Sequence, residues 1–173
     1  RFYGGTGDDL FDGGPRRNIS WGVSTSGDYD IADYNAETAA IALNLITLKV
    51  TGTTVGSDTL VGIEEVRATK LADSVTGSLA LRTVQAADAQ TGMSWVGLGG
   101  SDTVTQASAP MAYWADSVYV DYAWSGTAIR ATGSGNAISV AYTAGTMFWY
   151  GGTQAAGTDQ LTRVSSLGDS KYA

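Results

Sequence analysis

Apolar residues occur along the chain in short runs, and each run ends at a cluster of glycine, serine, threonine or aspartate. The runs are rich in β-branched and aromatic residues, which is typical of strands, and the clusters between them are typical of tight turns. This pattern predicts an all-β protein built from many short strands. The clearest runs read ISWGV, LVGI, SVTGS, SWVGL, DTVTQ, SVYVDYAW, AISVAYT and MFWY.

One apolar segment, AAIALNLITLKV at 39–50, allows two interpretations. Apolar residues alternate at Ile41, Leu43 and Leu45, and the phase then switches to begin again at Ile46. Alternation indicates a strand, whereas the alanines would also suit a helix over 37–45. We favour the strand because the corresponding segment later in the chain, AISVAYT, has a β-like composition.

A long internal repeat supports a stacked architecture. ADYNAETAAIALNL resembles VDYAWSGTAIRATG, with Tyr34 corresponding to Tyr122 at an offset of 88 residues. Further along, Asp58 corresponds to Asp159 at an offset of 101, so an insertion lies between these anchors, in TGSGNA and TMFWYGG. Repeats of short strands predict a parallel β-roll or β-helix, that is, a solenoid.

The composition narrows the possible functions. The 173 residues include 17 acidic and 10 basic side chains, no cysteine and no histidine, with a net charge of −7. This balance argues against nucleic acid or an anionic membrane surface as a partner, and no apolar run approaches the length of a membrane span. Without cysteine or histidine, the chain has no disulfide framework, no thiolate zinc site and no Ser-His-Asp triad.

The stretch YGGTGDDLFDGG at 3–14 holds the most specific motif. Its residues 4–12 fit the nonapeptide G-G-x-G-x-D-x-U-x, where U is a large apolar residue. Gly5 and Gly7 allow a tight turn with positive φ, so that carbonyl oxygens converge, and Asp9 adds a carboxylate. Calcium prefers such a set of oxygen ligands. The sequence therefore predicts a Ca²⁺ site here, while an Asp/Gly-rich turn that binds nothing is the alternative.

This nonapeptide resembles the RTX (repeats-in-toxin, hemolysin-type) repeats of bacterial secreted proteins. The resemblance implies that Asp9 and the carbonyls of Gly5 and Gly7 are calcium ligands, and that each ion lies between two turns that are one coil apart. It also implies that the chain folds after type I secretion, when it meets the calcium outside the cell. The next nonapeptide, GGPRRNISW, departs from the pattern with Arg16 and Asn18 in place of glycine and aspartate. We interpret residues 1–20 as the end of a repeat array.

A second, degenerate nonapeptide, GLGGSDTVT, begins at Gly97. Gly100 and Asp102 occupy expected ligand positions, but a leucine replaces the second glycine. Calcium binding and a turn that keeps its shape without an ion both remain open here. We expect two spacer repeats around it, so the predicted segments are 1–20, 21–96, 97–106 and 107–173, with the last incomplete and the chain continuing at both ends.

The remaining polar and aromatic groups have plainer interpretations. The acidic loop GDYDIADY lacks the full spacing of a calcium loop, so we expect it to be solvated. Aspartates that close turns of the spacer pattern are expected to accept hydrogen bonds from backbone amides; they are Asp58, Asp73 and Asp159. Four aromatic residues could form a sugar-stacking surface or fill the interior; they are Trp114, Trp124, Trp149 and Tyr150.

These observations lead us to expect a calcium-binding structural segment of a secreted or cell-surface bacterial protein, without enzymatic activity of its own. Its expected partners are calcium ions and neighbouring repeats of the same longer chain or further copies. Two alternatives stay open. One is an accessory or polysaccharide-binding part of a secreted enzyme, and the other is an adhesin or surface-layer assembly module.

Overall fold

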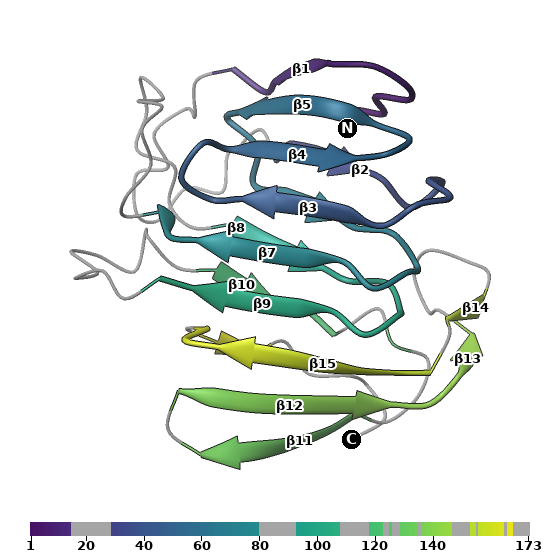
Figure 1. Ribbon diagram of the computed structural model, residues 1–173, viewed down its shortest axis with the longest axis vertical. Helices are drawn as coiled ribbons and strands as arrows, with labels where there is room; N and C mark the ends of the chain where they lie inside the picture. Colours follow the sequence, from purple (N-terminus) through teal and green to yellow (C-terminus); the bar gives the residue numbers. More distant parts are fainter. Residues whose placement is uncertain are drawn as a thin grey trace, which may run out of the picture.

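The computed structural model describes residues 1–14, 29–79, 93–107, 118–122, 125, 129–134, 136–146, 153–154, 156–164 and 166–167. In Figure 1 these residues form two facing β-sheets and a short hairpin. The larger sheet has nine strands, in the order β1 (Leu10–Asp12), β5 (Gly56–Val61), β4 (Lys49–Gly52), β3 (Ile41–Asn44), β7 (Ser74–Gly77), β9 (Thr103–Gln106), β15 (Gly157–Thr162), β12 (Ala137–Tyr142) and β11 (Ile129–Ser134).

The smaller sheet has five strands, in the order β16 (Ser166–Leu167), β10 (Val118–Val120), β8 (Met93–Val96), β6 (Glu65–Arg67) and β2 (Ile31–Asp33). All of its strands are parallel, and Phe2 adds a further parallel bridge to Ala32 at the β2 edge. The separate hairpin joins β13 (Gly145–Thr146) to β14 (Thr153–Gln154).

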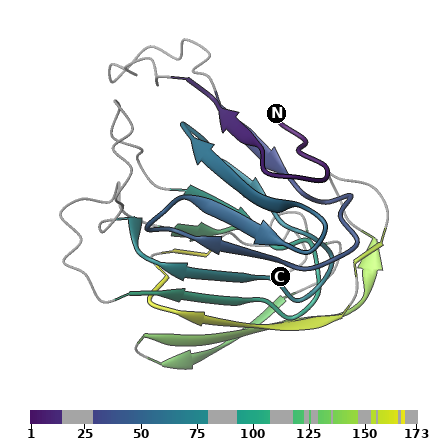
Figure 2. The ribbon, with the colours of Figure 1, turned by 45° about the horizontal axis from the view of Figure 1, so that its top comes forward.

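The chain passes back and forth between the two sheets as it advances along them. Strands β6, β8 and β10 of the smaller sheet alternate in sequence with β7 and β9 of the larger one. Strands β1, β3, β5, β7, β9, β11 and β15 run in one direction, and only β4 and β12 of the larger sheet run against them. Figure 2 shows the two sheets lying over one another along this path.

Side chains that point between the sheets form the core. Phe11 of β1 is buried although its neighbours Leu10 and Asp12 are exposed, as the two-residue period of a strand requires. Trp95 and Val66, from adjacent strands of the smaller sheet, are buried on the same inner side. The apolar positions of the short runs therefore supply the interior.

The prediction of an all-β chain is confirmed, and the helix considered for 37–45 does not form. Ile41–Asn44 is strand β3, and the switch in apolar phase marks a tight turn into the antiparallel strand β4. Leu48 takes a positive φ of 52° in this turn. The runs ISWGV and MFWY lie outside the described residues. Within the described part of the chain, no helix is long and apolar enough to cross a membrane.

The internal repeat appears as two antiparallel meanders, β3–β4–β5 and β11–β12–β15. Leu43 pairs with Val50 in the first, and Ala131 pairs with Val140 in the second. The offset between the copies is 88 residues at the first strand, 90 at the second and 101 at the third. Most of the predicted insertion therefore lies between β12 and β15, where the β13–β14 hairpin stands.

Candidate functional site

One turn recurs at the start of strands in the larger sheet. It reads glycine, a small or acidic polar residue, aspartate, any residue and then a buried apolar residue. The four copies are Gly7-Asp8-Asp9-Leu10-Phe11, Gly56-Ser57-Asp58-Thr59-Leu60, Gly100-Ser101-Asp102-Thr103-Val104 and Gly157-Thr158-Asp159-Gln160-Leu161. Asp73 opens β7 in the same way, with Leu71 in the glycine position.

Each inner aspartate binds the strand next to it through its carboxylate. In every pair the Oδ1 atom accepts a hydrogen bond from a backbone N–H on the neighbouring strand. The pairs, from donor N to acceptor Oδ1, are Asp9 to Asp58 at 2.9 Å, Ile41 to Asp73 at 2.7 Å, Asp73 to Asp102 at 2.9 Å and Asp102 to Asp159 at 2.8 Å. We call this set the aspartate ladder; each of its acceptors faces the β1 end of the sheet.

The second oxygen of each inner carboxylate also has a donor. These donors lie on strand β8 of the smaller sheet or just after its strands β2, β6 and β10. They are the Tyr34 hydroxyl to Asp58 at 3.0 Å, the Thr69 amide to Asp73 at 2.8 Å, the Trp95 Nε1 to Asp102 at 3.4 Å and the Tyr122 hydroxyl to Asp159 at 2.6 Å. The expectation that Asp58, Asp73 and Asp159 bind backbone amides is thus confirmed, although most of the amides belong to other strands.

The ladder is electrostatically costly. Asp58, Asp73, Asp102 and Asp159 are buried, and burial raises the pKa of each carboxyl. The pKa of Asp73 rises to about 6, and for Asp102 the charges of Asp159 and Asp73 add to the effect of burial. The N–H and O–H donors lower these pKa values again. The donors therefore make it possible to hold carboxylates inside the protein.

In the first predicted calcium turn, one oxygen of the Asp9 carboxylate accepts no hydrogen bond from the described residues. Gly5 and Gly7 have positive φ values of 86° and 117°, as a glycine turn requires. Asp9 Oδ2 is buried, has no hydrogen-bond partner among the described residues, and lies close to Gly4. A carboxylate oxygen without a donor fits a cation better than one that is already bonded. Ca²⁺ at this turn stays a prediction.

The second predicted turn keeps the shape of the first, with its carboxylate engaged. Leu98 and Gly100 have positive φ values of 61° and 88°, so leucine adopts the conformation of the glycine that it replaces. Both oxygens of Asp102 accept hydrogen bonds from within the chain. A calcium ion on Asp102 would have to displace these donors, so the geometry favours Asp9 over Asp102. The prediction for Gly100 and Asp102 is not otherwise tested.

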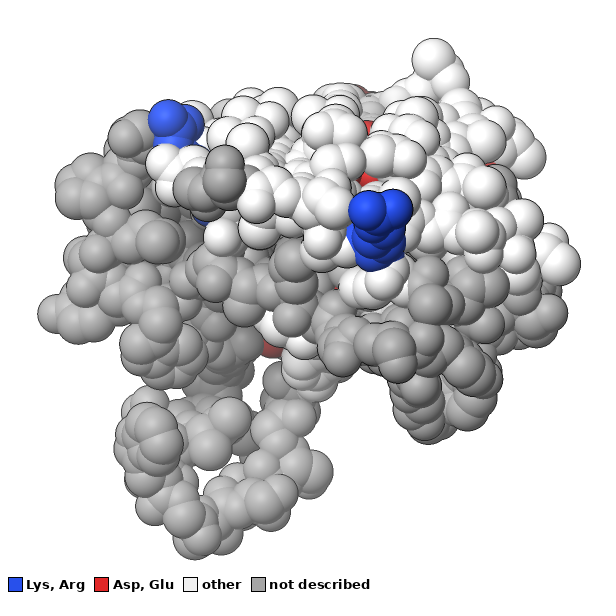
Figure 3. Space-filling view, turned by 90° about the horizontal axis from the view of Figure 1, so that it is seen from below, with Lys and Arg blue, Asp and Glu red and all other residues white. Residues whose placement is uncertain are grey.

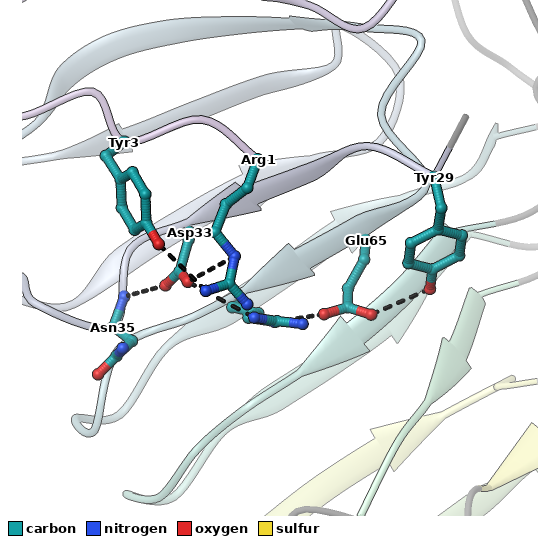
Figure 4. Close-up of polar contacts among 7 residues, drawn as sticks. Arg1, Tyr3, Tyr29, Asp33, Asn35 and Glu65 are labelled. Atoms are coloured by element: carbon teal, nitrogen blue, oxygen red, sulfur yellow. Dashed lines mark hydrogen bonds and ion pairs between the residues drawn. The ribbon is translucent and has the colours of Figure 1, made fainter. Parts of the chain in front are cut away.

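A second polar cluster lies on β2 and β6 (Figure 4). Asp33 pairs with the guanidinium groups of Arg1 at 3.5 Å and Arg67 at 3.7 Å. Arg67 also pairs with Glu65, whose other oxygen accepts the Tyr29 hydroxyl at 3.0 Å. The cluster fastens the first residues of the chain to the smaller sheet. Its two carboxylates face guanidinium groups, which suits an ion-pair clamp.

The expectation of a solvated acidic loop is wrong for Asp33. Its side chain is buried, because β2 lies inside the smaller sheet between the Phe2 bridge and β6, and arginines balance its charge. Asp28 of the acidic loop lies outside the described residues, and so do the four aromatic residues considered for sugar stacking or for the interior: Trp114, Trp124, Trp149 and Tyr150. Among the described residues, no group of three or more His, Cys, Asp or Glu is placed to hold a metal ion.

In the sequence, the nonapeptides and the spacer aspartates form two patterns that differ in their surrounding residues. Aligned together, the four Gly-x-Asp-x-apolar turns form one pattern, which indicates that their aspartates share one role. The comparisons with known proteins add no further guide: neither protein-family models, nor curated protein sequences, nor solved structures gave a match to this chain.

Proposed function

We propose that this chain is a calcium-binding structural β-solenoid segment of a secreted or cell-surface bacterial protein, with no catalytic role. The observation that carries the proposal is the recurrence of one turn whose aspartate holds the next strand. In repeat proteins each unit is stabilised mainly by its neighbours. A carboxylate that bonds the N–H of the adjacent strand is a device for such contacts, and its repetition supports a role in building an extended shape.

Within this proposal the first turn, residues 4–9, holds the ion. Asp9 would supply a carboxylate oxygen, and the glycine turn at Gly5 and Gly7 would supply carbonyl oxygens. A bound divalent cation would neutralise the adjacent carboxylates of Asp8 and Asp9, which repel one another in its absence. Support comes from the partnerless oxygen of Asp9 and from the match of this turn to the nonapeptide.

The test is a calorimetric titration of the chain with CaCl₂, followed by urea unfolding with and without EDTA. The native chain should bind calcium and unfold at higher urea when the ion is present. Asp9→Ala should lose most of the binding. Asp12→Ala is the matched control, because its exposed carboxylate accepts a hydrogen bond from the nearby Gly14 amide, and it should bind like the native chain.

Asp9→Asn, which keeps the size of the side chain, guards against a folding defect in the alanine variant. Circular dichroism of each variant shows whether its strands are retained. A native chain that binds no calcium at about 1 mM, the range of weak extracellular sites, would contradict the calcium part of the proposal. A chain whose Asp9 and Asp12 variants bind equally well would move the ion to another position.

A further inference from the structure

The two ends of the larger sheet differ in the groups that they offer. At one end β1 has no further strand beside it among the described residues, and at the other end the same holds for β11. The two strands run in the same direction. A second copy shifted along the stack would therefore place its β1 parallel to β11 of the first.

The internal repeat shows how the β11 edge can be occupied. Strand β11 corresponds to β3 of the first meander, at the offset of 88 residues. The outer edge of β3 is filled by β7, in parallel, and the Ile41 amide of β3 donates to Asp73 at the start of β7. The residue of β11 that corresponds to Ile41 is Ile129. By this correspondence, the Ile129 N–H would donate a hydrogen bond to a carboxylate at the start of a strand placed next to β11.

The β1 end offers that carboxylate. Asp9 stands at the start of β1 as Asp73 stands at the start of β7, and it is the outermost residue of the aspartate ladder. Among the described residues, no N–H is bonded to its Oδ2, and no further strand lies beyond it to bond its Oδ1. The Asp9 carboxylate at one end thus matches the Ile129 amide that the repeat places at the other end.

Charge is also complementary between the ends. Asp8 precedes β1 and Asp12 is its last residue, and both side chains are exposed. On β11 and its neighbours, 129–134, 136–146 and 156–164, the exposed charged side chains are Arg130 and Arg163. Figure 3 views this end from below, where two groups of blue atoms project from the white, described part of the face, which shows little red. Among the described residues, β1 therefore offers exposed acidic side chains, and the β11 end offers exposed basic ones.

The register of the β3–β7 pair predicts specific neighbours across such a contact. Ala42 lies opposite Ser74, one residue after Asp73, so Arg130 would lie opposite Leu10, one residue after Asp9. Arg130 would then stand between Asp8 and Asp12, which are two residues away on the same face and within reach of a long side chain. Ala131, exposed in one copy although its counterpart Leu43 is buried, would lie opposite Phe11.

We propose that β1 of one copy binds β11 of a second copy, in parallel, so that the chain associates head to tail. The proposal rests on the structural role given above and names the partner as this chain itself. Such a contact uses a different surface on each partner, so it can repeat and extend into a filament. Edge strands that present unpaired backbone groups are suited to this kind of addition.

The test is sedimentation velocity at several protein concentrations, in low salt and in about 0.5 M NaCl, where exposed charges are screened. The native chain should show a sedimentation coefficient that rises with concentration in low salt and rises less in high salt. Arg130→Glu should abolish the rise. Arg163→Glu is the matched control, because it reverses the same charge at the same end away from β11, and it should associate like the native chain.

The decisive arm combines two variants. Asp8→Lys with Asp12→Lys makes the β1 end basic and should stay monomeric alone. Mixed with Arg130→Glu, it should associate again, because each contact then joins opposite charges. The Asp8 carboxylate also accepts a hydrogen bond from the Ser57 amide at 2.8 Å, which the lysine at position 8 removes. If the double variant has a lower thermal midpoint than the native chain, Asp12→Lys alone is used in its place.

A native chain that stays monomeric in low salt overturns the proposal, as does a mixture that fails to associate or an Arg163→Glu variant that loses association like Arg130→Glu. These outcomes do not depend on calcium affinity. A chain that binds calcium and stays monomeric therefore contradicts head-to-tail stacking alone, whereas a chain that stacks and binds no calcium contradicts only the calcium part of the proposed function.

Discussion

Replacing Asp159 by alanine removes the last acceptor of the aspartate ladder. Its Oδ1 accepts the Asp102 amide at 2.8 Å and the Tyr142 hydroxyl at 3.0 Å, and its Oδ2 accepts the Tyr122 hydroxyl at 2.6 Å. Tyr142 also bonds the Gly100 carbonyl at 2.8 Å and keeps that partner. In the variant, the Asp102 amide therefore has no acceptor, and the Tyr122 hydroxyl loses its hydrogen bond to a carboxylate.

The size of the effect follows from these losses. A buried N–H left without an acceptor costs about 1–3 kcal/mol, and a hydrogen bond to a charged group contributes about 1.5–3 kcal/mol. Alanine also removes a carboxyl whose pKa is raised by burial, so the fold no longer holds an unfavourable charge at neutral pH. That relief offsets part of the loss. We expect Asp159→Ala to lower the free energy of unfolding by about 2–4 kcal/mol at pH 7.

Asp159→Asn separates the acceptor from the charge. The amide oxygen can accept from Asp102, and the amide nitrogen can donate to the Tyr122 hydroxyl oxygen, which also acts as an acceptor. We expect this variant to lie within about 1 kcal/mol of the native chain at pH 7. The assay is urea unfolding with linear extrapolation for the three proteins. Equal stability of the alanine and asparagine variants would refute the argument that the Asp159 oxygens hold the neighbouring strand.

Two further predictions concern pH and the core. Because burial raises the pKa of Asp73 from 3.8 to about 6, the folded chain binds this proton more tightly than the unfolded chain. By the linkage of stability to proton binding, the free energy of unfolding should be highest below about pH 4 and fall as the pH rises through about 6. Urea midpoints that stay level or rise over this range would contradict this prediction. Asp159→Asn removes another buried carboxyl of raised pKa, so it should make the dependence of stability on pH less steep. The ring of Phe11 stacks on the rings of Phe2 and Tyr34, with centroid distances of 5.6 and 6.0 Å. Phe11→Ala should therefore lower the free energy of unfolding by about 3–5 kcal/mol in the same assay. Leu10→Ala, on the exposed side of the same strand, should cost less than about 0.5 kcal/mol, and similar costs for the two would mean that the strand faces the other way.

Local patterns were enough to predict the strands. Runs such as DTVTQ and AISVAYT carry their own β propensity and end at turn residues, and they form β9 and β12. The segment that begins at Ile41 was harder, since a change of apolar phase can mark a turn or a bulge. It became a hairpin because Leu48 takes a positive φ there, which leucine rarely adopts and which composition does not indicate.

The ladder could be predicted only in part. Turn aspartates were expected to bond backbone amides, because their side chains reach nearby N–H groups. The actual donors lie far away in sequence: Asp58 bonds an amide 49 residues earlier, and Asp159 bonds one 57 residues earlier. Only the packing of one strand against the next fixes such pairs, so a single turn does not reveal them. The buried ion pairs of Asp33 escaped prediction for the same reason.

The most direct test of the aspartate ladder is the hydrogen-exchange rate of the Asp102 amide, measured by ¹⁵N NMR in the native chain and in the two Asp159 variants. We expect slow exchange in the native chain and in Asp159→Asn, where a side-chain oxygen accepts a hydrogen bond from this N–H. We expect much faster exchange in Asp159→Ala, with the amides inside β12 still protected by their own strand partners. An Asp102 amide that exchanges as freely as an exposed loop in the native chain would contradict the aspartate ladder.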